Sequence, residues 1–302
     1  MARQQQDADE LFDVKNAFYI GNYQQAINEA QSISPQTPLV AIQRDAYLYR
    51  SYIAQGNYRI VQQELKNADP LLQPLKLLID YLSPGANKLA IVADIDARVA
   101  KGTELTNEVF IIVASTIYYH EENYEAALKI FHGCESIDLQ AFQLQCLLAM
   151  RRPDLAKKTL KSLQEVEDDG TITQLAQAWV NLSLGGPGVQ DAHYSIMELS
   201  ERLGVLGAGP AAVGAAAAAS RGLLEESEQM LTEAVSRAPT HPDLLLGLAV
   251  TARHSSKPPE VSGRYFAQLL DSHPDHPFSR EYLAKTNEFK RLAAQYQPSV
   301  AN

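Results

Sequence analysis

The chain has 302 residues, of which 46% are hydrophobic and 21% charged, and its formal net charge is −10 at pH 7. This hydrophobic fraction can bury a sizeable core and excludes a chain that is disordered along its whole length. The negative charge repels phosphate backbones, and basic residues cluster at most in pairs, so no nucleic acid is expected as a partner. No segment has eighteen consecutive apolar residues, and we expect no transmembrane segment.

The N-terminal half of the chain contains a repeated tripeptide. Gly-Asn-Tyr occurs at residues 21–23 and 56–58, and the related Glu-Asn-Tyr occurs at 122–124. The first two tyrosines are 35 residues apart and the third follows after 66, which is twice 33. This period resembles the tetratricopeptide repeat (TPR), a helix-turn-helix of about 34 residues. The spacing continues, with weaker sequence similarity, at Leu155, Val189, Leu224 and Pro258.

Each repeat is expected to be a pair of helices joined by a tight turn. The best-matched unit spans residues 111–139, where the small and aromatic residues of the TPR pattern are Ala114, Tyr118, Tyr124, Ala127 and Phe131. Small residues let two helices cross closely, and aromatic residues fill the space toward the next repeat. Gly21 and Gly56 are expected to need a positive φ, which β-branched residues resist.

Apolar residues recur at helical spacing along the rest of the chain, and no alternating strand pattern persists. Thr171 and Gln174 form a capping-box pattern that predicts the start of a helix. The sequence therefore predicts an all-α protein, a right-handed α-superhelix of about eight TPR-like helix-turn-helix repeats. We expect a single solenoid over residues 9–296, with disordered tails at 1–8 and 297–302.

Residues 203–219, LGVLGAGPAAVGAAAAA, match a different pattern. Gly207, Gly209 and Ala212 have the GxGxxG/A spacing of a dinucleotide-binding loop. Such a loop works between a buried strand and a helix, because the start of the helix must face the pyrophosphate. Only residues 203–206 could form that strand, and four residues are too few. We favour a structural turn and helix here, and keep a dinucleotide-binding enzyme as the weaker alternative.

Few other residues suggest a catalytic, metal-binding or other functional site. Residues 241–243 and 273–275 both spell His-Pro-Asp, the tripeptide of J-domains, but no basic helix precedes either. We favour a proline at the first position of a helix in both cases. Cys134 and Cys146 lack the spacing of a zinc site. We assign no catalytic, metal-binding or cofactor-binding residue, and we expect no enzymatic activity.

A TPR array binds its partner along a groove lined by the first helix of each pair. The repeat frame places these candidate groove residues there: Leu11, Lys15, Phe18, Arg50, Ile112, Thr116, Tyr119, Gln143, Leu147, Gln177, Asn181, Ala212, Ala216 and Ala219. In TPR proteins that capture chaperone C-terminal carboxylates, a Lys/Asn clamp lines the groove. Its first two positions are Leu11 and Lys15 here, and its later basic positions are Val109 and Val113, so that clamp is not expected.

Four segments carry a more specific resemblance: DELFDVKNAFYIGNYQQAI, RDAYLYRSYIAQGNY, NEVFIIVASTIYYHEENYEAAL and TNEFKRLAAQY. Together with residues 178–188, AWVNL followed by a Gly-rich loop, they resemble the epsilon subunit family of coatomer, the COPI vesicle coat. The resemblance covers Asp9 to about Tyr296. It implies a non-enzymatic coat subunit that grips the C-terminal domain of the coatomer alpha subunit and contacts other coatomer subunits indirectly.

The same resemblance implies a role in Golgi-to-ER retrograde and intra-Golgi transport. The expected location is the cytoplasm, with membrane association at the Golgi and on COPI vesicles only through the assembled coat. The first ten residues, MARQQQDADE, show no signal-peptide pattern, in agreement with this location. A TPR chaperone adaptor, or a scaffold of another complex, remains the alternative binding protein.

Overall fold

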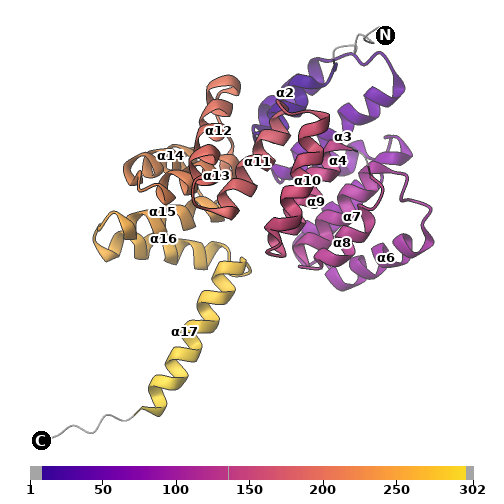
Figure 1. Cartoon of the computed structure of the whole chain (residues 1–302). Helices are drawn as coiled ribbons and strands as arrows, with labels where there is room; N and C mark the ends of the chain where they lie inside the picture. The colour runs from indigo at the N-terminus through magenta and orange to yellow at the C-terminus, as the bar shows by residue number, and fades with distance from the viewer. Residues whose placement is uncertain (1–8, 135, 297–302) are drawn as a thin grey trace, which may run out of the picture. The chain divides into compact units, whose positions relative to one another are not determined.

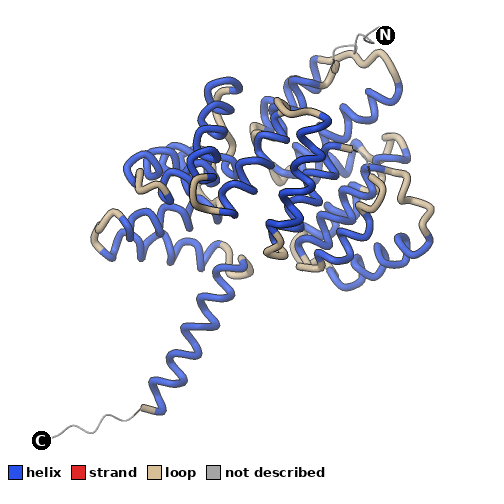
Figure 2. The backbone as a smooth tube through the Cα atoms, in the orientation of Figure 1, coloured by secondary structure: helices blue, strands red, loops and turns tan. Residues whose placement is uncertain are grey.

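The computed structural model describes residues 9–134 and 136–296, and the tails expected at 1–8 and 297–302 lie outside them. Within this part of the chain every regular element is a helix, as Figure 2 shows. Seventeen α-helices and one 3-10 helix follow one another in residues 9–134 and 136–296 (Figure 1). The predicted all-α class is confirmed.

The described residues form two compact units that divide between Gly207 and Ala208. The first unit contains α1 (Phe12–Tyr19), α2 (Tyr23–Ser32), α3 (Pro38–Ala54), α4 (Tyr58–Glu64), η1 (Pro70–Leu72), α5 (Leu75–Leu82), α6 (Lys88–Lys101), α7 (Glu108–His120), α8 (Tyr124–Ile130), α9 (Ile137–Ala149), α10 (Pro153–Val166), α11 (Thr171–Leu184) and α12 (Gly188–Leu203). The second contains α13 (Ala208–Ser220), α14 (Leu224–Arg237), α15 (Pro242–His254), α16 (Pro259–Ser272) and α17 (Pro277–Gln295). One solenoid over residues 9–296 stays a prediction.

One turn geometry joins the two helices of several pairs. The second residue after the end of the first helix has a positive φ in six described pairs, at Gly21, Gly56, Glu122, Arg151, Gly222 and Ser256. At each of them, the N–H of this residue donates to the carbonyl three residues earlier, and the next N–H donates to the carbonyl five residues earlier. These bonds satisfy carbonyls that the end of a helix leaves unpaired. The positive φ predicted for Gly21 and Gly56, +78° at both, is confirmed.

Each residue of the Gly-Asn-Tyr tripeptide has a part in this turn. The glycine adopts the left-handed conformation without a steric cost. The asparagine is the N-cap of the second helix: the Asn22 side chain accepts a hydrogen bond from the N–H of Gln25 and Asn123 accepts one from Ala126, whereas Asn57 makes no side-chain cap bond. The tyrosine is the first residue of that helix in all three repeats. The tripeptide is therefore a helix stop followed directly by a helix start.

At the repeat positions with weaker sequence similarity, the predicted starts of the second helices agree with the observed starts to different degrees. Leu224 is the first residue of α14, as the spacing predicts, and Pro258 is one residue early, at the N-cap of α16. Leu155 is two residues late, because α10 begins at Pro153, whose fixed φ suits the first position of a helix. Val189 lies in the first turn of α12. The period of about 34 residues therefore locates these second helices within one turn.

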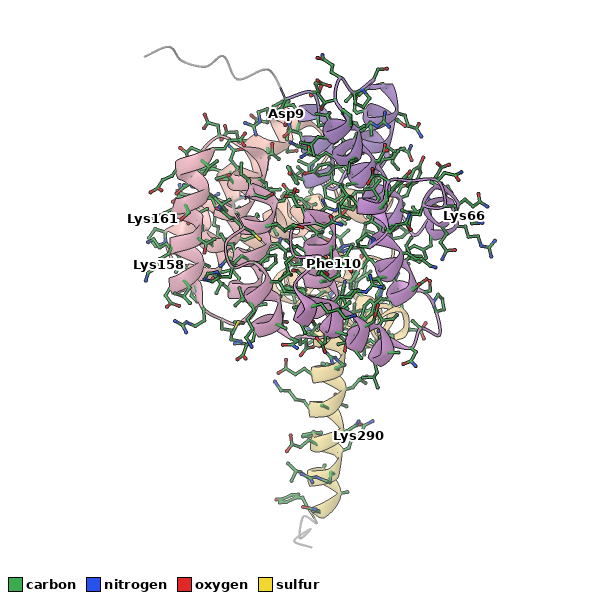
Figure 3. The ribbon with its side chains drawn as sticks, turned by 90° about the vertical axis from the view of Figure 1, so that its right-hand side faces the viewer. Asp9, Lys66, Phe110, Lys158, Lys161 and Lys290 are labelled. Atoms are coloured by element: carbon green, nitrogen blue, oxygen red, sulfur yellow. The ribbon has the colours of Figure 1, made fainter. Side chains whose placement is uncertain are left out.

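A large hydrophobic core of the first unit extends from α3 to α9 and includes the fully buried Phe110. Figure 3 shows Phe110 among the helices, whereas Lys66, Lys158 and Lys161 project from the outside of the unit. Ala114, Ile117 and Ala127 are also fully buried in this core. The small residues of the repeat pattern thus lie where helices cross, as predicted.

Helix α1 also contacts a helix far along the chain. It packs against α2 and α3 and against α11. The Thr171 hydroxyl donates to the Asn16 side-chain carbonyl oxygen at 2.8 Å, and both residues are buried. The predicted capping box is therefore wrong: Gly170 is the N-cap of α11 and makes no side-chain cap bond. The hydroxyl instead forms a tertiary hydrogen bond, which satisfies a buried polar group of α1.

At Gly207 the end of the first unit contacts the turn between α1 and α2. The Gly207 N–H donates to the carbonyl of Ile20 at 2.7 Å, and a Cβ placed on Gly207 would lie 2.6 Å from the carbonyl oxygen of Gly21. A Cβ on Gly209 would meet nothing within 4 Å. The preceding residues end helix α12 at Leu203 and contain no strand. Close approach of two backbones, not a phosphate, therefore accounts for the first glycine of the dinucleotide-like pattern.

The two His-Pro-Asp tripeptides occupy different positions. His241 is the N-cap of α15 and Pro242 its first residue, as predicted. Residues 273–275 instead lie between α16 and α17, where His276 is the N-cap and Pro277 the first residue. The helix start expected at the second tripeptide is wrong, because the next His-Pro pair begins the helix.

Replacing the two glycines of the dinucleotide-like pattern should have opposite effects. Gly207→Ala should lower the free energy of unfolding by roughly 1–3 kcal/mol, because the new methyl group overlaps the first turn. Gly209→Ala should be neutral or slightly stabilising, since Gly209 lies in a helix with open space around it. Thermal and urea denaturation measure both. Equal melting temperatures for the two variants would show that the two backbones do not meet.

Gly56→Val should cost about 1–2 kcal/mol through backbone conformation alone. A Cβ at Gly56 meets nothing within 4 Å, so no side-chain clash contributes. Gly56→Asn is the matched control, because asparagine tolerates the left-handed region and should lose much less stability. If valine and asparagine had the same effect in denaturation, the turn would not need the left-handed conformation.

Candidate functional site

An open cavity of about 540 Å³ lies inside the first unit. Its walls come chiefly from α1, α3, α7, α9 and α11, each the first helix of a pair. Apolar side chains from three of them, Phe12, Ile42 and Ile112, share the lining with charged residues. A concave, mostly apolar surface with a few placed polar groups is the usual form of a binding site.

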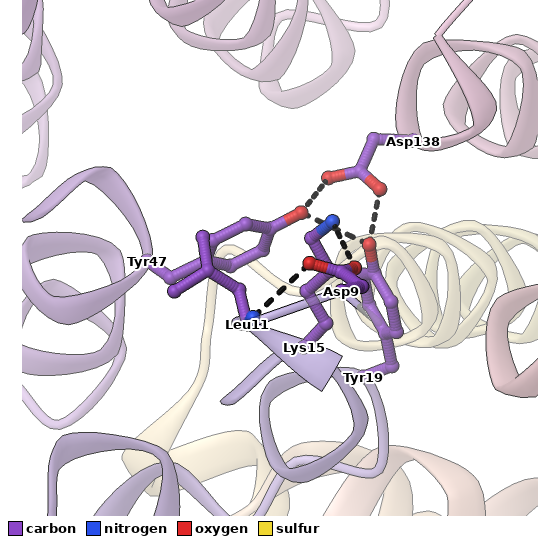
Figure 4. Close-up of polar contacts among 6 residues, drawn as sticks. All are labelled: Asp9, Leu11, Lys15, Tyr19, Tyr47 and Asp138. Carbon is purple, nitrogen blue, oxygen red and sulfur yellow. Dashed lines mark hydrogen bonds and ion pairs between the residues drawn. The ribbon is translucent and has the colours of Figure 1, made fainter. Parts of the chain in front are cut away.

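A half-buried carboxylate, that of Asp138, organises the polar wall of this cavity (Figure 4). The hydroxyl of Tyr47 donates to one carboxylate oxygen of Asp138 at 2.6 Å, and the hydroxyl of Tyr19 donates to the other. The two hydroxyl oxygens are 3.0 Å apart. Because each phenol has a single proton, both protons are used on the carboxylate. Tyr19, Tyr47 and Asp138, here termed the Asp138 cluster, thus join α1, α3 and α9.

Burial and charge keep both phenols of the Asp138 cluster neutral. Burial, and then the negative charge of Asp138, raises the pKa of Tyr19 well above its usual value. The same two causes, in the same order, raise the pKa of Tyr47. The cluster is therefore a set of two neutral donors and one ionised acceptor, a satisfied arrangement for partly buried polar groups.

Both cations that line the cavity are paired. The Lys15 ammonium lies 2.7 Å from a carboxylate oxygen of Asp9 (Figure 4). The Arg50 guanidinium lies 3.7 Å from Asp138 and 4.5 Å above the centre of the Phe18 ring. Of the described residues, no further Lys or Arg lines the cavity. The cavity therefore presents no unpaired cation to a ligand.

The structure brings three of the predicted groove residues together in this cavity, namely Lys15, Arg50 and Ile112. Leu11 and Leu147 were expected in the groove, but they are only 1% and 6% exposed and belong to apolar clusters. Core packing accounts for both corrections. The other predicted residues of this unit are half-buried outside the cavity lining: Phe18, Thr116, Tyr119, Gln143, Gln177 and Asn181.

In the second unit, the predicted groove residues lie on the alanine-rich helix α13. Ala216 is exposed, and Ala212 and Ala219 are half-buried. Ala215 and Ala218 are buried on the other side, where α13 packs against α14 and α15. The helix therefore has a packed face and an accessible face, at the positions that the repeat frame predicts. That the accessible face binds a partner stays a prediction.

Sequence reasoning missed the Asp138 cluster. Tyr19 and Tyr47 fall in the first helices of two repeats, 28 residues apart, and their phenols share one acceptor. The available signal was Asp138, the one charged residue in the stretch 137–149. Its position in the first turn of α9 also suits the helix dipole, so the sequence offered no reason to prefer a tertiary role.

No group of three or more His, Cys, Asp or Glu residues in the described part of the chain is arranged to hold a metal ion. Among the helices of the same described residues, none has the length and apolar character needed to cross a bilayer.

The Asp138 cluster should make stability depend on alkaline pH. In the folded chain the pKa of Tyr19 and of Tyr47 lies above the value near 10 of an unfolded tyrosine. Their contribution is therefore complete below about pH 10 and is lost as the pH rises through the folded values. We expect the free energy of unfolding to fall above about pH 10, and phenolate absorbance from these residues to appear only on unfolding.

Asp138→Asn should lower the free energy of unfolding by roughly 1–3 kcal/mol at neutral pH, because the phenols and Arg50 lose their ionised partner. Asp168→Asn, at an exposed position in the loop after α10, is the control and should change it by less than about 0.5 kcal/mol. Equal stability of the two variants in urea denaturation would contradict a structural role for the cluster.

Two solved structures share this fold at low sequence identity. A chain in the crystal structure of the APC/C hetero-tetramer Cut9-Hcn1 aligns with 91% of this chain and 55% of its own length, with a TM-score of 0.62 and 13% identity. A tetratricopeptide repeat protein from Parabacteroides merdae aligns over 91% of this chain and 96% of its own, with a TM-score of 0.54 and 10% identity. Both likenesses support the TPR-like fold alone.

Sequence similarity is more specific. Residues 7–297 match the family model described as coatomer epsilon subunit. The chain is 35% identical over 292 residues to coatomer subunit epsilon-1 of Arabidopsis thaliana, covering 95% of this chain and 97% of that protein. It is 34% identical to coatomer subunit epsilon of Dictyostelium discoideum, covering 94% and 96%. The chain therefore belongs to the coatomer epsilon subunit family.

Proposed function

We propose that this protein is a non-catalytic adaptor subunit of the COPI coat that binds and stabilises the C-terminal domain of the coatomer alpha subunit. The observation that carries the proposal is the family match over residues 7–297. The inner cavity supports it, because five helices turn side chains from separate repeats toward one open space. A surface assembled in this way suits a protein segment, since several repeats can contact it at once.

On this proposal the protein acts in Golgi-to-ER retrograde and intra-Golgi vesicle transport. It is located in the cytoplasm and peripherally on Golgi membranes and COPI-coated vesicles, which it reaches through the assembled coat. Its association with the remainder of coatomer is then indirect, through the alpha subunit.

Isothermal titration calorimetry with the purified C-terminal domain of the alpha subunit tests the proposal directly. We expect saturable binding at one site per chain, and co-elution of the two proteins in gel filtration. No detectable heat and separate elution would contradict it. In that case affinity purification from cells followed by mass spectrometry would identify the complex to which the chain belongs.

Two neighbouring alanines of α13 separate partner binding from packing. Ala216→Arg places a long charged side chain on the exposed face, so it should weaken binding of the alpha-subunit domain about tenfold or more while leaving the melting temperature nearly unchanged. Ala215→Trp should instead overpack a residue that is 1% exposed and lower the free energy of unfolding by roughly 1–3 kcal/mol. Wild-type affinity for Ala216→Arg in calorimetry would exclude this face from the groove.

A further inference from the structure

We propose that the inner cavity of the first unit accepts an apolar segment of the partner that carries a basic side chain, and that it rejects an acidic C-terminal peptide. The inference rests on the proposed function, since the occupant is taken to be a segment from the C-terminal domain of the alpha subunit. Two independent features of the cavity carry it: its exposed apolar side chains and its uncompensated carboxylates.

The apolar side chains of the cavity are unusually open to solvent. Leu39, Phe12 and Leu71 are 64%, 57% and 43% exposed, and all three line the same space. Single exposed apolar residues are normal on a protein surface, but several that gather at one concave site indicate a covered surface. An apolar segment placed there removes their area from water, which is the main favourable contribution to most protein associations.

The charges of the cavity favour a cationic occupant. Four carboxylates line it, and two of them, Asp9 and Asp138, are paired with Lys15 and Arg50. Glu108 and Glu167 complete the acidic set, and neither forms an ion pair within the described part of the chain. The pairing therefore leaves two negative charges without a partner.

A cationic and an anionic occupant therefore interact differently with the charges that line the cavity. A Lys or Arg side chain that enters with the apolar segment can pair with Glu108 or Glu167 as water is displaced and the effective dielectric falls. A terminal carboxylate would find both cations already paired and would lie near two further carboxylates. Like charges brought together at an interface oppose binding strongly, so the same residues select for one occupant and against the other.

Calorimetry of the full chain with the same alpha-subunit domain tests the charges. The double variant Glu108→Gln with Glu167→Gln should bind at least tenfold more weakly than wild type, and its affinity should depend less on salt. The double variant Glu165→Gln with Asp168→Asn is the matched control. It removes the same net charge from exposed positions, in the last turn of α10 and in the loop that follows, which do not line the cavity, so its affinity should change less than twofold.

The apolar contribution is tested separately by Leu39→Ser. This side chain is largely exposed, so its replacement should leave the melting temperature of the free chain unchanged and weaken binding at least tenfold. If wild type binds the alpha-subunit domain but the Glu108/Glu167 variant binds as tightly, the inference is wrong and the proposed function stands. Wild-type affinity for the Leu39 variant would likewise overturn it.

A pair of synthetic peptides decides the inference without the alpha subunit. Both have the same apolar residues; one carries a lysine and an amidated end, and the other a glutamate and a free C-terminal carboxylate. The lysine peptide should bind the wild-type chain at least tenfold more tightly, and the Glu108/Glu167 variant should abolish the difference. If the alpha-subunit domain itself does not bind, the proposed function fails, and equal or reversed peptide affinities would also overturn the charge preference.

Discussion

The left-handed residue that ends the first helix of a pair is the constraint on which the rest of this structure depends. It occurs with the same two backbone hydrogen bonds at six positions, three of them glycines. This residue satisfies the last carbonyls of one helix and reverses the chain, and the second helix starts within two or three residues. Because the reversal is so short, the two helices must pack against each other, and only small residues at the crossing allow that approach. Within the first unit, the first helices α1, α3, α7, α9 and α11 line one cavity.

That interior contains polar groups that must be satisfied. Asp138 accepts from two phenols and pairs with Arg50, and Lys15 pairs with Asp9, so the wall is charged and yet none of the cations described there is free. Neutral phenols with raised pKa values are suited to this role, since they donate to a carboxylate without adding charge. The ion pairs that stabilise the wall also determine what it can bind, because an anionic ligand finds no unpaired cation there.

The glycine-rich stretch illustrates how one pattern can arise from two different physical needs. A dinucleotide loop uses glycine so that a phosphate can approach the backbone. Here Gly207 lets another backbone approach, that of Gly21 in the first turn, and its N–H donates to the carbonyl of Ile20. The buried hydrogen bond from Thr171 to Asn16 joins the same regions of the unit through side chains. In both cases glycine is needed because another group comes close to its backbone. The surrounding helices determine whether that group is a phosphate or a second stretch of backbone.

The sequence by itself determined the helices, the turns and the repeat period. Left-handed glycines, asparagine caps and apolar spacing act within a few residues, so Gly21, Gly56 and Leu224 could be placed without coordinates. Only the tertiary structure decided the cavity wall, because its bonds join residues 91, 119 and 155 positions apart. Such pairs depend on how far each repeat rotates relative to the last, a sum of many packing contacts that no local pattern records. For the same reason Leu11, the N-cap of α1, and Leu147 of α9 are core residues, since a small rotation of a helix exchanges its inner and buried faces.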